Sequence, residues 1–353
     1  MKNTTTTLTM ALIYVGIILG AGFASGAEIM AYFVEFGRAG SIGLVLASAL
    51  FGLTGWAIWD ICQRMGVSDY KSFTDITMGR LAPVMEAVLG LFMFIIFAAM
   101  LAAMGAALNE SFGINYLLAV CVVALACFVT FLFGISGIIK LNAYISPILI
   151  VGCMVIGVWT FVMRTEPAVA IAERGAEMLR ANWYMSAMTY VGYNIVGAVV
   201  ILPSLVTGAP KKARSMLKPA IFSGLILFAL GLSLYLSLSA NFALVEGSQI
   251  PILTLIRGHN PIWSYSFMLL FLGACATTAA TNGYAVSVTI SERFKIGNAK
   301  KIALKLLICI GGVVAALMGF ANFVRVIYPL FAMVGIVEIT LIIKSSVALG
   351  RKI

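Results

Sequence analysis

Long apolar runs alternate with short polar connections along the whole chain. A helix rises about 1.5 Å per residue, so roughly twenty apolar residues cross about 30 Å of hydrocarbon. The runs are continuous and do not alternate residue by residue, which predicts helices and not the strands of a barrel. We therefore expect an all-α integral membrane protein with ten transmembrane helices. The ten segments are 8–36, 39–61, 81–108, 114–133, 138–163, 183–207, 217–243, 262–290, 302–321 and 323–347.

The composition supports this interpretation. Apolar residues make up 62% of the 353 residues and charged residues 10%, and the mean hydropathy is +1.08. Soluble domains are about half apolar and about a quarter charged. The values exclude soluble, disordered and disulfide-scaffold proteins, and they make the lipid bilayer the expected surroundings. The six cysteines fall within or at the end of apolar segments, without the spacing of a metal or redox site, and are expected to be small buried hydrophobes.

The net charge of +10 suggests a nucleic-acid partner only until the basic residues are located. They lie in the connections, and an excess of Lys and Arg marks the cytoplasmic side of a membrane protein. With the N-terminus inside, the outer side holds few of the 23 basic residues. These are Arg38, Arg164, Arg174, Arg180, Arg257 and Arg325. We expect a multi-pass protein of the cell membrane with both termini in the cytoplasm and no nucleic-acid partner.

The start of the chain has an alternative interpretation. Lys2, the apolar run 8–19 and the small residues that follow imitate a cleaved secretory signal. The apolar run resumes at Ile29, which favours a first transmembrane span.

Three connections are long enough to hold structure. Residues 62–80 and 165–182 are expected to form helices at the membrane interface. Residues 245–261 carry an apolar run between Gly247 and Gly258 and predict either a hairpin that dips back as a lid or a plain surface loop.

Glycine clusters interrupt the first and sixth spans. The first span has three glycines and a serine within Gly20–Gly26. The sixth span has Gly192 and Gly197 within Tyr190–Gly197. A glycine costs about 1 kcal/mol in a helix relative to alanine, and unpaired backbone in a membrane occurs only where protein or a watery cavity surrounds it. Gly16, Gly20, Gly22 and Gly26 also form overlapping GxxxG pairs, which favour helix packing instead.

The position of the two clusters favours a binding site. They open two halves of five spans, and five is an odd number, so the halves have opposite orientation. Interrupted helices at matching places in inverted halves indicate the central site of a transporter. We expect a first repeat at 1–163, an outer connecting segment at 164–182 and a second repeat at 183–353.

Three motifs support a family resemblance. GAGFASGAE at Gly20–Glu28, YNIVG at Tyr193–Gly197 and NFVRVIYPLF at Asn322–Phe331 resemble the YkvI-type membrane proteins of the amino acid–polyamine–cation superfamily. The resemblance covers essentially the whole chain. It implies the LeuT-type fold, a 5+5 inverted repeat in which spans one, two, six and seven rock against spans three, four, eight and nine.

A sodium site is expected between the first and eighth spans. Thr277, Thr278 and Ala274 share one helical face, and hydroxyls that face freed carbonyls offer the hard oxygens that sodium prefers. In LeuT-type sodium symporters such a site takes carbonyls from span one and a carbonyl and two hydroxyls from span eight. Matching residue by residue implies Gly16, Leu19, Ala274, Thr277 and Thr278. The alternative is that the threonines bond to carbonyls of their own helix.

The substrate pocket is expected beside this site. Backbone N–H groups after Gly22 would bind a carboxylate, the asparagines an amine or amide, and the aromatic rings would form its walls. The expected residues are Ala21, Gly22, Phe23, Ala24, Ser25, Gly26, Tyr190, Gly192, Tyr193, Asn194, Thr278 and Asn282.

Acidic residues in spans are expensive and are usually functional. We expect Glu28 to approach Arg325 as part of an outer gate, with a purely structural pair as the alternative, and Glu338 to carry a proton or be paired in the bundle. His259 is given no role.

No motif of an enzyme or an ATPase is found. The leading hypothesis is a secondary active transporter that takes up a small amino acid or related zwitterion or amine with sodium, without any cofactor. The alternatives are proton coupling through Glu28 or Glu338, and a sensor of the same fold that binds an amino acid.

Overall fold

The computed structural model describes residues 7–133, 136–163, 180–208, 216–257 and 261–350. These residues form helices joined by short connections, with no strand in the described part of the chain. In chain order the helices are α1 (Thr7–Ile18), α2 (Ala21–Ala24), α3 (Ala27–Tyr32), η1 (Val34–Phe36), α4 (Gly37–Met65), α5 (Tyr70–Met78), η2 (Gly79–Leu81), α6 (Ala82–Phe112), α7 (Tyr116–Phe133), α8 (Ser136–Val162), α9 (Trp183–Ala198), η4 (Leu202–Gly208), α10 (Leu217–Ala240), α11 (Phe242–Val245), α12 (Pro251–Arg257), α13 (Pro261–Arg293), α14 (Asn298–Ala316), α15 (Phe320–Asn322), η6 (Phe323–Ile327) and α16 (Tyr328–Gly350).

The all-α class is confirmed, and each expected apolar segment corresponds to a helix or to consecutive helices. Within the described residues, 6 helical stretches have the length and apolarity to cross a membrane, and Thr7–Ile18 and Pro147–Val162 are shorter apolar helices. The count of ten spans therefore stays a prediction.

The first span is broken where the glycines predict it. The α1 helix ends at Ile18, and after Leu19 and Gly20 the chain forms only the single turn α2 before it turns again at Ser25 and Gly26. Gly26 has φ +81°, a left-handed conformation that glycine adopts without steric cost. Three short helical pieces, α1, α2 and α3, thus replace one continuous helix.

The sixth span is broken later than expected. The α9 helix runs without interruption through the whole cluster Tyr190–Gly197 and ends at Ala198, and η4 begins only at Leu202. The glycines of this cluster serve packing instead. A Cβ on Gly192 would lie 2.7 Å from the carbonyl oxygen of Ala332, and one on Gly335 would lie 1.9 Å from the carbonyl oxygen of Gly192. These glycines let α9 and α16 cross at close range.

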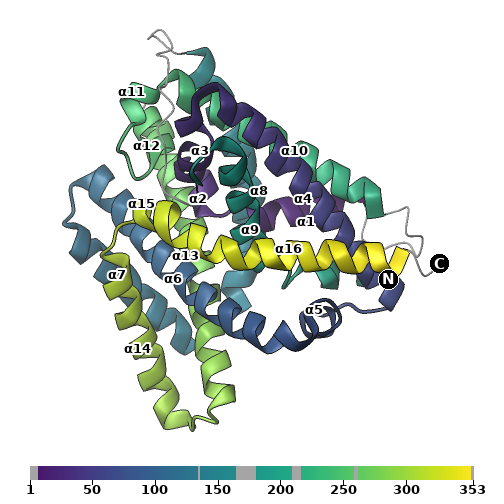
Figure 1. The fold of residues 1–353 in the computed structure, drawn as a ribbon. Coiled ribbons are helices and arrows are strands. Elements are labelled where there is room, and N and C mark those ends of the chain that lie inside the picture. Colours follow the sequence, from purple (N-terminus) through teal and green to yellow (C-terminus); the bar gives the residue numbers. More distant parts are fainter. Residues whose placement is uncertain (1–6, 134–135, 164–179, 209–215, 258–260, 351–353) are drawn as a thin grey trace.

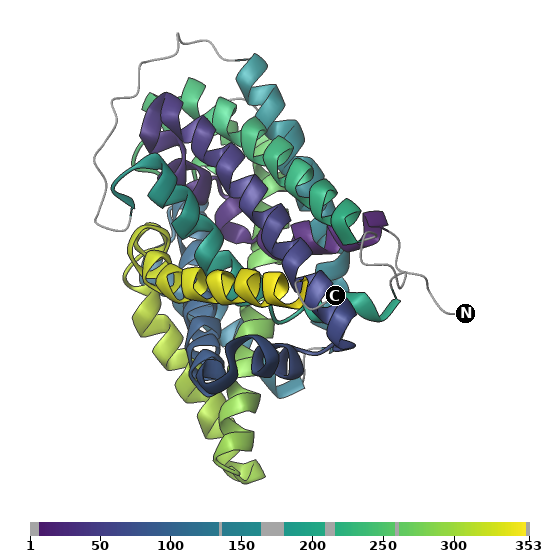
Figure 2. The ribbon, with the colours of Figure 1, turned by 45° about the vertical axis from the view of Figure 1, so that its right-hand side comes forward.

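The broken first span lies inside the bundle. Helices α1, α2 and α3, in purple, are surrounded by α4, α8, α9 and α10 (Figure 1), and α1 contacts α8, α9 and α10. The second half of α13 and the helix α14 form a hairpin that projects at the bottom of both views (Figures 1 and 2). The break is therefore enclosed by protein on several sides, as unpaired backbone in a membrane requires.

Two of the three connections hold helices. Residues 62–80 contain the end of α4 and the helix α5, which Asp69 caps by accepting a hydrogen bond from the N–H of Ser72 (2.9 Å). This bond lowers the pKa of the Asp69 carboxyl below its ordinary value. Residues 245–261 contain α12, whose apolar side chains Ile252, Leu253 and Ile256 are buried, so the segment is folded against the bundle. The interfacial helix expected at 165–182 lies mostly outside the described residues, as does His259.

The cysteines follow the expectation with one exception. Five are buried, whereas Cys121 on α7 is exposed.

Candidate functional site

The break in the first span leaves backbone carbonyls without partners. The N–H of Gly20 donates to the carbonyl oxygen of Ile18 (2.9 Å) instead of to Gly16, which a continuous helix would use. The next described bond runs from the N–H of Ala24 to Gly20 (3.1 Å). None of the backbone hydrogen bonds between described residues ends on the carbonyl oxygen of Gly16 or Leu19. These two oxygens are available to a cation.

The eighth span brings its hydroxyls to the same region. Helix α13 contacts α2, which follows Leu19 and Gly20 directly. The hydroxyl of Thr277 is buried and donates to the carbonyl oxygen of Ala274 (2.9 Å), which is the alternative weighed from the sequence. Among described residues, the hydroxyl of Thr278 makes no hydrogen bond, and it is only partly buried. The set Gly16, Leu19, Ala274, Thr277 and Thr278 stays a proposal for a sodium site.

Of the backbone N–H groups after Gly22 that were expected to hold a carboxylate, all but that of Phe23 are already used. Those of Ala24, Ser25 and Gly26 donate to Gly20, Ala21 and Phe23 at 3.1, 2.8 and 3.0 Å. The N–H of the next residue bonds to the hydroxyl of Ser25 (3.1 Å). The structure therefore does not present the anion cradle that the sequence predicts at Ala24–Gly26.

A carboxylate of the protein itself lies against this turn. Glu28 is 5% exposed, and a Cβ added to Gly22 would lie 2.1 Å from its Oε1. The left-handed Gly26 reverses the chain, and this turn returns the Glu28 side chain onto Gly22. Its Oε2 is buried without a hydrogen-bond partner. None of the ion pairs between described residues includes Glu28. Glycine at position 22 therefore makes room for a charged group inside the bundle.

Tyrosines surround this carboxylate. Tyr190 and Tyr193 of α9 interact electrostatically with Glu28, and so does Tyr328 at the start of α16. The hydroxyls of Tyr190 and Tyr193 are buried beside the Glu28 carboxyl and bond to no other described group. The ring of Tyr193 lies 4.9 Å from that of Tyr328 and 5.7 Å from that of Tyr32. We call Glu28, Tyr190 and Tyr193 the Glu28 site.

The two expected asparagines bond within their own helices. The Nδ2 of Asn194 donates to the carbonyl oxygen of Tyr190 (2.9 Å), and that of Asn282 donates to Thr278 (2.9 Å). Both side chains are partly buried. Because these bonds use the amide nitrogens, the Oδ1 atoms remain available as acceptors. Gly192 contributes to the crossing with α16, as described above.

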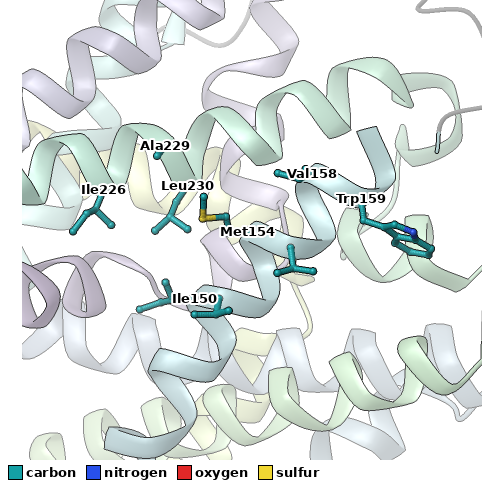
Figure 3. A pocket seen from close by; sticks show the side chains of 9 residues that line it. Ile150, Met154, Val158, Trp159, Ile226, Ala229 and Leu230 are labelled. Carbon is teal, nitrogen blue, oxygen red and sulfur yellow. The ribbon is translucent and has the colours of Figure 1, made fainter. Parts of the chain in front are cut away.

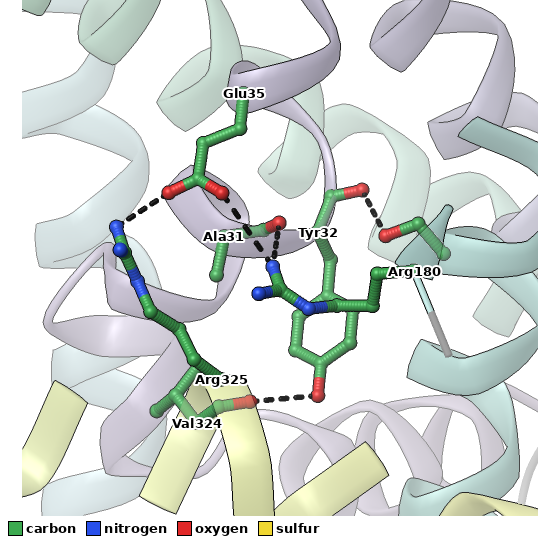
Figure 4. Close-up of polar contacts among 7 residues, drawn as sticks. Ala31, Tyr32, Glu35, Arg180, Val324 and Arg325 are labelled. Atoms are coloured by element: carbon green, nitrogen blue, oxygen red, sulfur yellow. Dashed lines mark hydrogen bonds and ion pairs between the residues drawn. The ribbon is translucent and has the colours of Figure 1, made fainter. Parts of the chain in front are cut away.

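The expected pairing of Glu28 with Arg325 is wrong. Arg325 pairs instead with Glu35, at 2.5 Å between Nη2 and Oε1, and buried Arg180 approaches the other oxygen of Glu35 at 3.5 Å (Figure 4). We call Glu35, Arg180 and Arg325 the Glu35 cluster. Glu28 lies near the start of α3 and Glu35 lies in η1, after the end of α3, so the carboxylate that reaches Arg325 is the later one.

Further bonds hold the Glu35 cluster closed. Arg180 also donates to the carbonyl oxygen of Ala31 (2.6 Å), and its guanidinium lies 5.5 Å from the centre of the Tyr32 ring. The hydroxyl of Tyr32 donates to the carbonyl oxygen of Val324 (2.9 Å; Figure 4). Val324 and Arg325 belong to η6, a π-helical turn of the kind often found at functional sites. These bonds tie the first span to the tenth.

The segment after α10 covers the same break. The N–H of Ile252 in α12 donates to the carbonyl oxygen of Ser25 (3.0 Å), and a Cβ on Gly26 would lie 3.0 Å from Ile252. Of the two interpretations of 245–261, the buried hairpin is therefore the one that the structure has.

Glu338, the third expected residue of the gate and coupling group, is buried at 2% exposure in α16. It interacts electrostatically with Tyr70 of α5.

The surface groove between α8 and α10 contains no residue of the expected site. A groove of about 590 Å³ between α8 and α10 is lined by apolar side chains such as Ile150, Met154 and Leu230 (Figure 3). A second groove, on α4 and α10, is also mostly apolar. Such surfaces suit lipid acyl chains and offer no group that would recognise a polar substrate.

The fold is that of the LeuT-type transporters. The chain is similar to MhsT in complex with L-phenylalanine (TM-score 0.64, 15% identity, 95% of this chain and 88% of that one). It is also similar to the inward-facing conformation of Mhp1 (TM-score 0.58, 18% identity, 95% and 75%). A third similar structure is a Na+-coupled sialic acid symporter (TM-score 0.54, 15% identity, 93% and 75%).

The sequence comparison leads to the same family as the motifs. The chain is 24% identical to the uncharacterized membrane protein YkvI of Bacillus subtilis over 93% of its own length and 92% of the relative's. It is 21% identical to the uncharacterized protein YyaD of the same organism, over 92% of each chain. No family model matches. The chain is therefore similar to the YkvI-type membrane proteins, and its fold is the LeuT-type fold.

Sequence reasoning missed three residues of this region. Glu35 lies near the end of the first apolar segment and is a second acid in that span. Arg180 was counted only as a basic residue of the outer side. Tyr328 was given no role, although it belongs to the motif NFVRVIYPLF. An acid inside an apolar segment was the available signal for Glu35.

Proposed function

We propose that the protein is a secondary active transporter that couples uptake of a small amino acid, or a related zwitterion or amine, to sodium. The observation that carries this proposal is the break at Leu19 and Gly20, with the carbonyls of Gly16 and Leu19 left without backbone partners next to α13. In a membrane such a break is tolerated where a ligand or ion uses the freed groups.

Sodium would bind the carbonyls of Gly16, Leu19 and Ala274 and the hydroxyls of Thr277 and Thr278. All five ligands are hard oxygens without a formal charge. The similar sialic acid symporter is Na+-coupled, which supports sodium as the coupling ion here. The substrate would bind on the other side of α2, beside Gly22, Tyr190 and Tyr193, with Asn194 and Asn282 within the same pair of spans.

Alternating access would rock spans one, two, six and seven against spans three, four, eight and nine, so that each moving unit takes spans from both repeats, 1–163 and 183–353, which 164–182 joins. The Glu35 cluster and α12 then form the closed gate on one face of the site. The distribution of basic residues supports an orientation with this face outside the cell and both termini in the cytoplasm. With this orientation the structure is closed to the outside.

Proton coupling is a second candidate, favoured by one observation. Glu28 and Glu338 are both buried, at 5% and 2% exposure, and neither takes part in an ion pair with another described residue. A buried carboxylate without a cation is a natural proton carrier. No comparable observation favours the sensor.

Uptake into proteoliposomes tests the proposal. Labelled amino acids and amines are offered under an inward sodium gradient, under an inward proton gradient, and with potassium on both sides. We expect accumulation under the sodium gradient alone, and its loss when Thr277 and Thr278 are both replaced by alanine. Accumulation driven by the proton gradient alone would select the second candidate. Sodium-driven accumulation that persists in the double variant would remove these threonines from the site.

A further inference from the structure

We propose that the Glu28 site binds the ammonium group of a small primary amine, and that the substrate needs no carboxylate. This inference rests on the proposed transport function, since it names the substrate class of the same site. It restricts the proposed substrates, which included zwitterions and amines, to cationic amines.

The Glu28 site contains several buried oxygens that can accept hydrogen bonds from a ligand. Three buried oxygens gather at one place, namely Oε2 of Glu28 and the hydroxyl oxygens of Tyr190 and Tyr193, and none of them bonds to a described group outside this set. Buried polar atoms in folded proteins nearly always have well-formed hydrogen bonds, so three oxygens that have no partner outside their own set indicate a missing ligand. A primary ammonium carries three N–H donors and can bond to all three acceptors.

The second step is charge. Glu28 is buried, and no lysine or arginine of the described chain pairs with it. An isolated buried carboxylate is strongly unfavourable, and a cation that binds there relieves this cost. A neutral or anionic ligand would not.

The third step concerns the walls. The rings of Tyr32, Tyr190, Tyr193 and Tyr328 form a continuous aromatic cluster with centroid distances of 5.4, 5.8 and 4.9 Å between successive pairs. Aromatic clusters of this kind stabilise organic cations through the ring quadrupole. The sodium site proposed above has no aromatic ligand, so the two sites recognise different cations.

The surroundings of α2 disfavour a ligand that carries a carboxylate. The N–H groups of Ala24, Ser25 and Gly26, which would hold a substrate carboxylate, donate to carbonyl oxygens of their own segment. The carboxylate of Glu28 lies against Gly22 in the same turn. A second carboxylate brought by the substrate would lie close to this acidic group, with only the N–H groups of Ala21, Gly22 and Phe23 left in the turn to bind it.

Direct binding of matched compounds tests this inference. The probes are isobutylamine, valine, isovalerate and isobutyltrimethylammonium, which share a branched carbon skeleton and differ in the charged groups. Affinities are measured by calorimetry on the purified full chain in detergent with sodium present. We expect isobutylamine to bind at least as tightly as valine, isovalerate not to bind, and the trimethylated compound to bind more weakly because it has no N–H donor.

Variants assign the binding to the site. We expect Glu28→Gln to weaken isobutylamine binding at least about ten-fold, because a hydrogen bond to a charged group is lost. Tyr190→Phe and Tyr193→Phe should each weaken it by about three- to ten-fold. The matched controls are Glu86→Gln and Tyr184→Phe, which make the same changes at exposed positions. Gly22→Ala provides a second route, since its Cβ must displace the Glu28 carboxylate without removing it.

The possible results separate this inference from the transport proposal. Binding of valine but not of isobutylamine, or unchanged amine affinity in both Glu28→Gln and Gly22→Ala, would overturn the inference even if sodium-driven uptake is found. Glu28-dependent binding of isobutylamine would support the inference even if no gradient drives uptake, in which case the transport proposal alone would fail.

Discussion

Two buried carboxylates of the first span have opposite surroundings. Glu35 lies between Arg180 and Arg325 and has both oxygens in ion pairs. Glu28 has no cationic partner in the described chain, and beside its carboxyl lie the buried hydroxyls of two tyrosines. The protein thus satisfies one carboxylate internally and leaves the other incomplete. We infer that the paired carboxylate closes the structure and that the unpaired one awaits a ligand.

The largest effect is expected when the paired carboxylate loses its charge. Glu35→Gln removes the negative charge that faces the guanidinium of Arg180, which is 2% exposed. Removing one partner of a buried pair costs about 3–5 kcal/mol of the free energy of unfolding. Denaturant titration in mixed micelles measures this value, with Glu86→Gln as the exposed control. A loss no greater than that of the control would show that the cluster does not stabilise the closed structure.

The second largest effect is expected where α9 and α16 cross at Gly192 and Gly335. Gly335→Ala places a Cβ 1.9 Å from the backbone oxygen of Gly192, which cannot move as a flexible side chain can. We expect the free energy of unfolding to fall by about 1–3 kcal/mol. The same titration compares it with Gly152→Ala, where no atom lies within 4 Å of the added Cβ. Equal stability of the two variants would contradict the close crossing.

A smaller effect of opposite sign is expected at the unpaired carboxylate. At alkaline pH and in the absence of ligand, where the carboxyl is ionised, Glu28→Gln removes a buried charge that has no cation, so the free energy of unfolding should rise by about 1 kcal/mol. The comparison with Glu35→Gln is direct, because the same chemical change is made twice in one span. A fall in stability as large as that of Glu35→Gln would mean that Glu28 has an internal partner.

The smallest effect is expected at Arg325. Its side chain is 44% exposed, so its bond to Glu35 is screened by solvent. Exposed ion pairs contribute about 0–1 kcal/mol, and we expect Arg325→Gln to lower the free energy of unfolding within that range. The change should shrink further at high salt, because screening already weakens the pair in the unmodified protein. A loss that exceeds that of Glu35→Gln would make Arg325, and not Arg180, the main partner.

Much of the fold could be predicted because apolar length and glycine chemistry are local properties. Gly20, Gly22 and Gly26 interrupt the first span within a few residues, and Gly26 adopts the left-handed conformation that only glycine takes easily. The end of α9 could not be predicted, because the role of Gly192 depends on Gly335, a residue far along the chain. Sequence alone does not distinguish a glycine that breaks a helix from one that packs it.

The candidate site was predicted in its elements but not in its charges. The chain segments of the Glu28 site were identified, and Tyr190 and Tyr193 do lie together beside Gly22. The partner of Arg325 was not, because Glu28 and Glu35 are both acids in one apolar segment and their sequence positions do not fix which one reaches the tenth span. The turns at Gly26 and at η1 decide this, and they are three-dimensional features.

The central claim is that an amine at Glu28 and sodium at the break in the same span bind together. Its most direct test is the affinity for isobutylamine in sodium against that in potassium, measured on the same purified protein and on the variant with Thr277 and Thr278 replaced by alanine. Coupled sites typically change each other's affinity by about 5–150-fold. We predict at least about five-fold tighter binding in sodium and no difference between the salts in the variant. Equal affinity of the unmodified protein in the two salts would contradict the account.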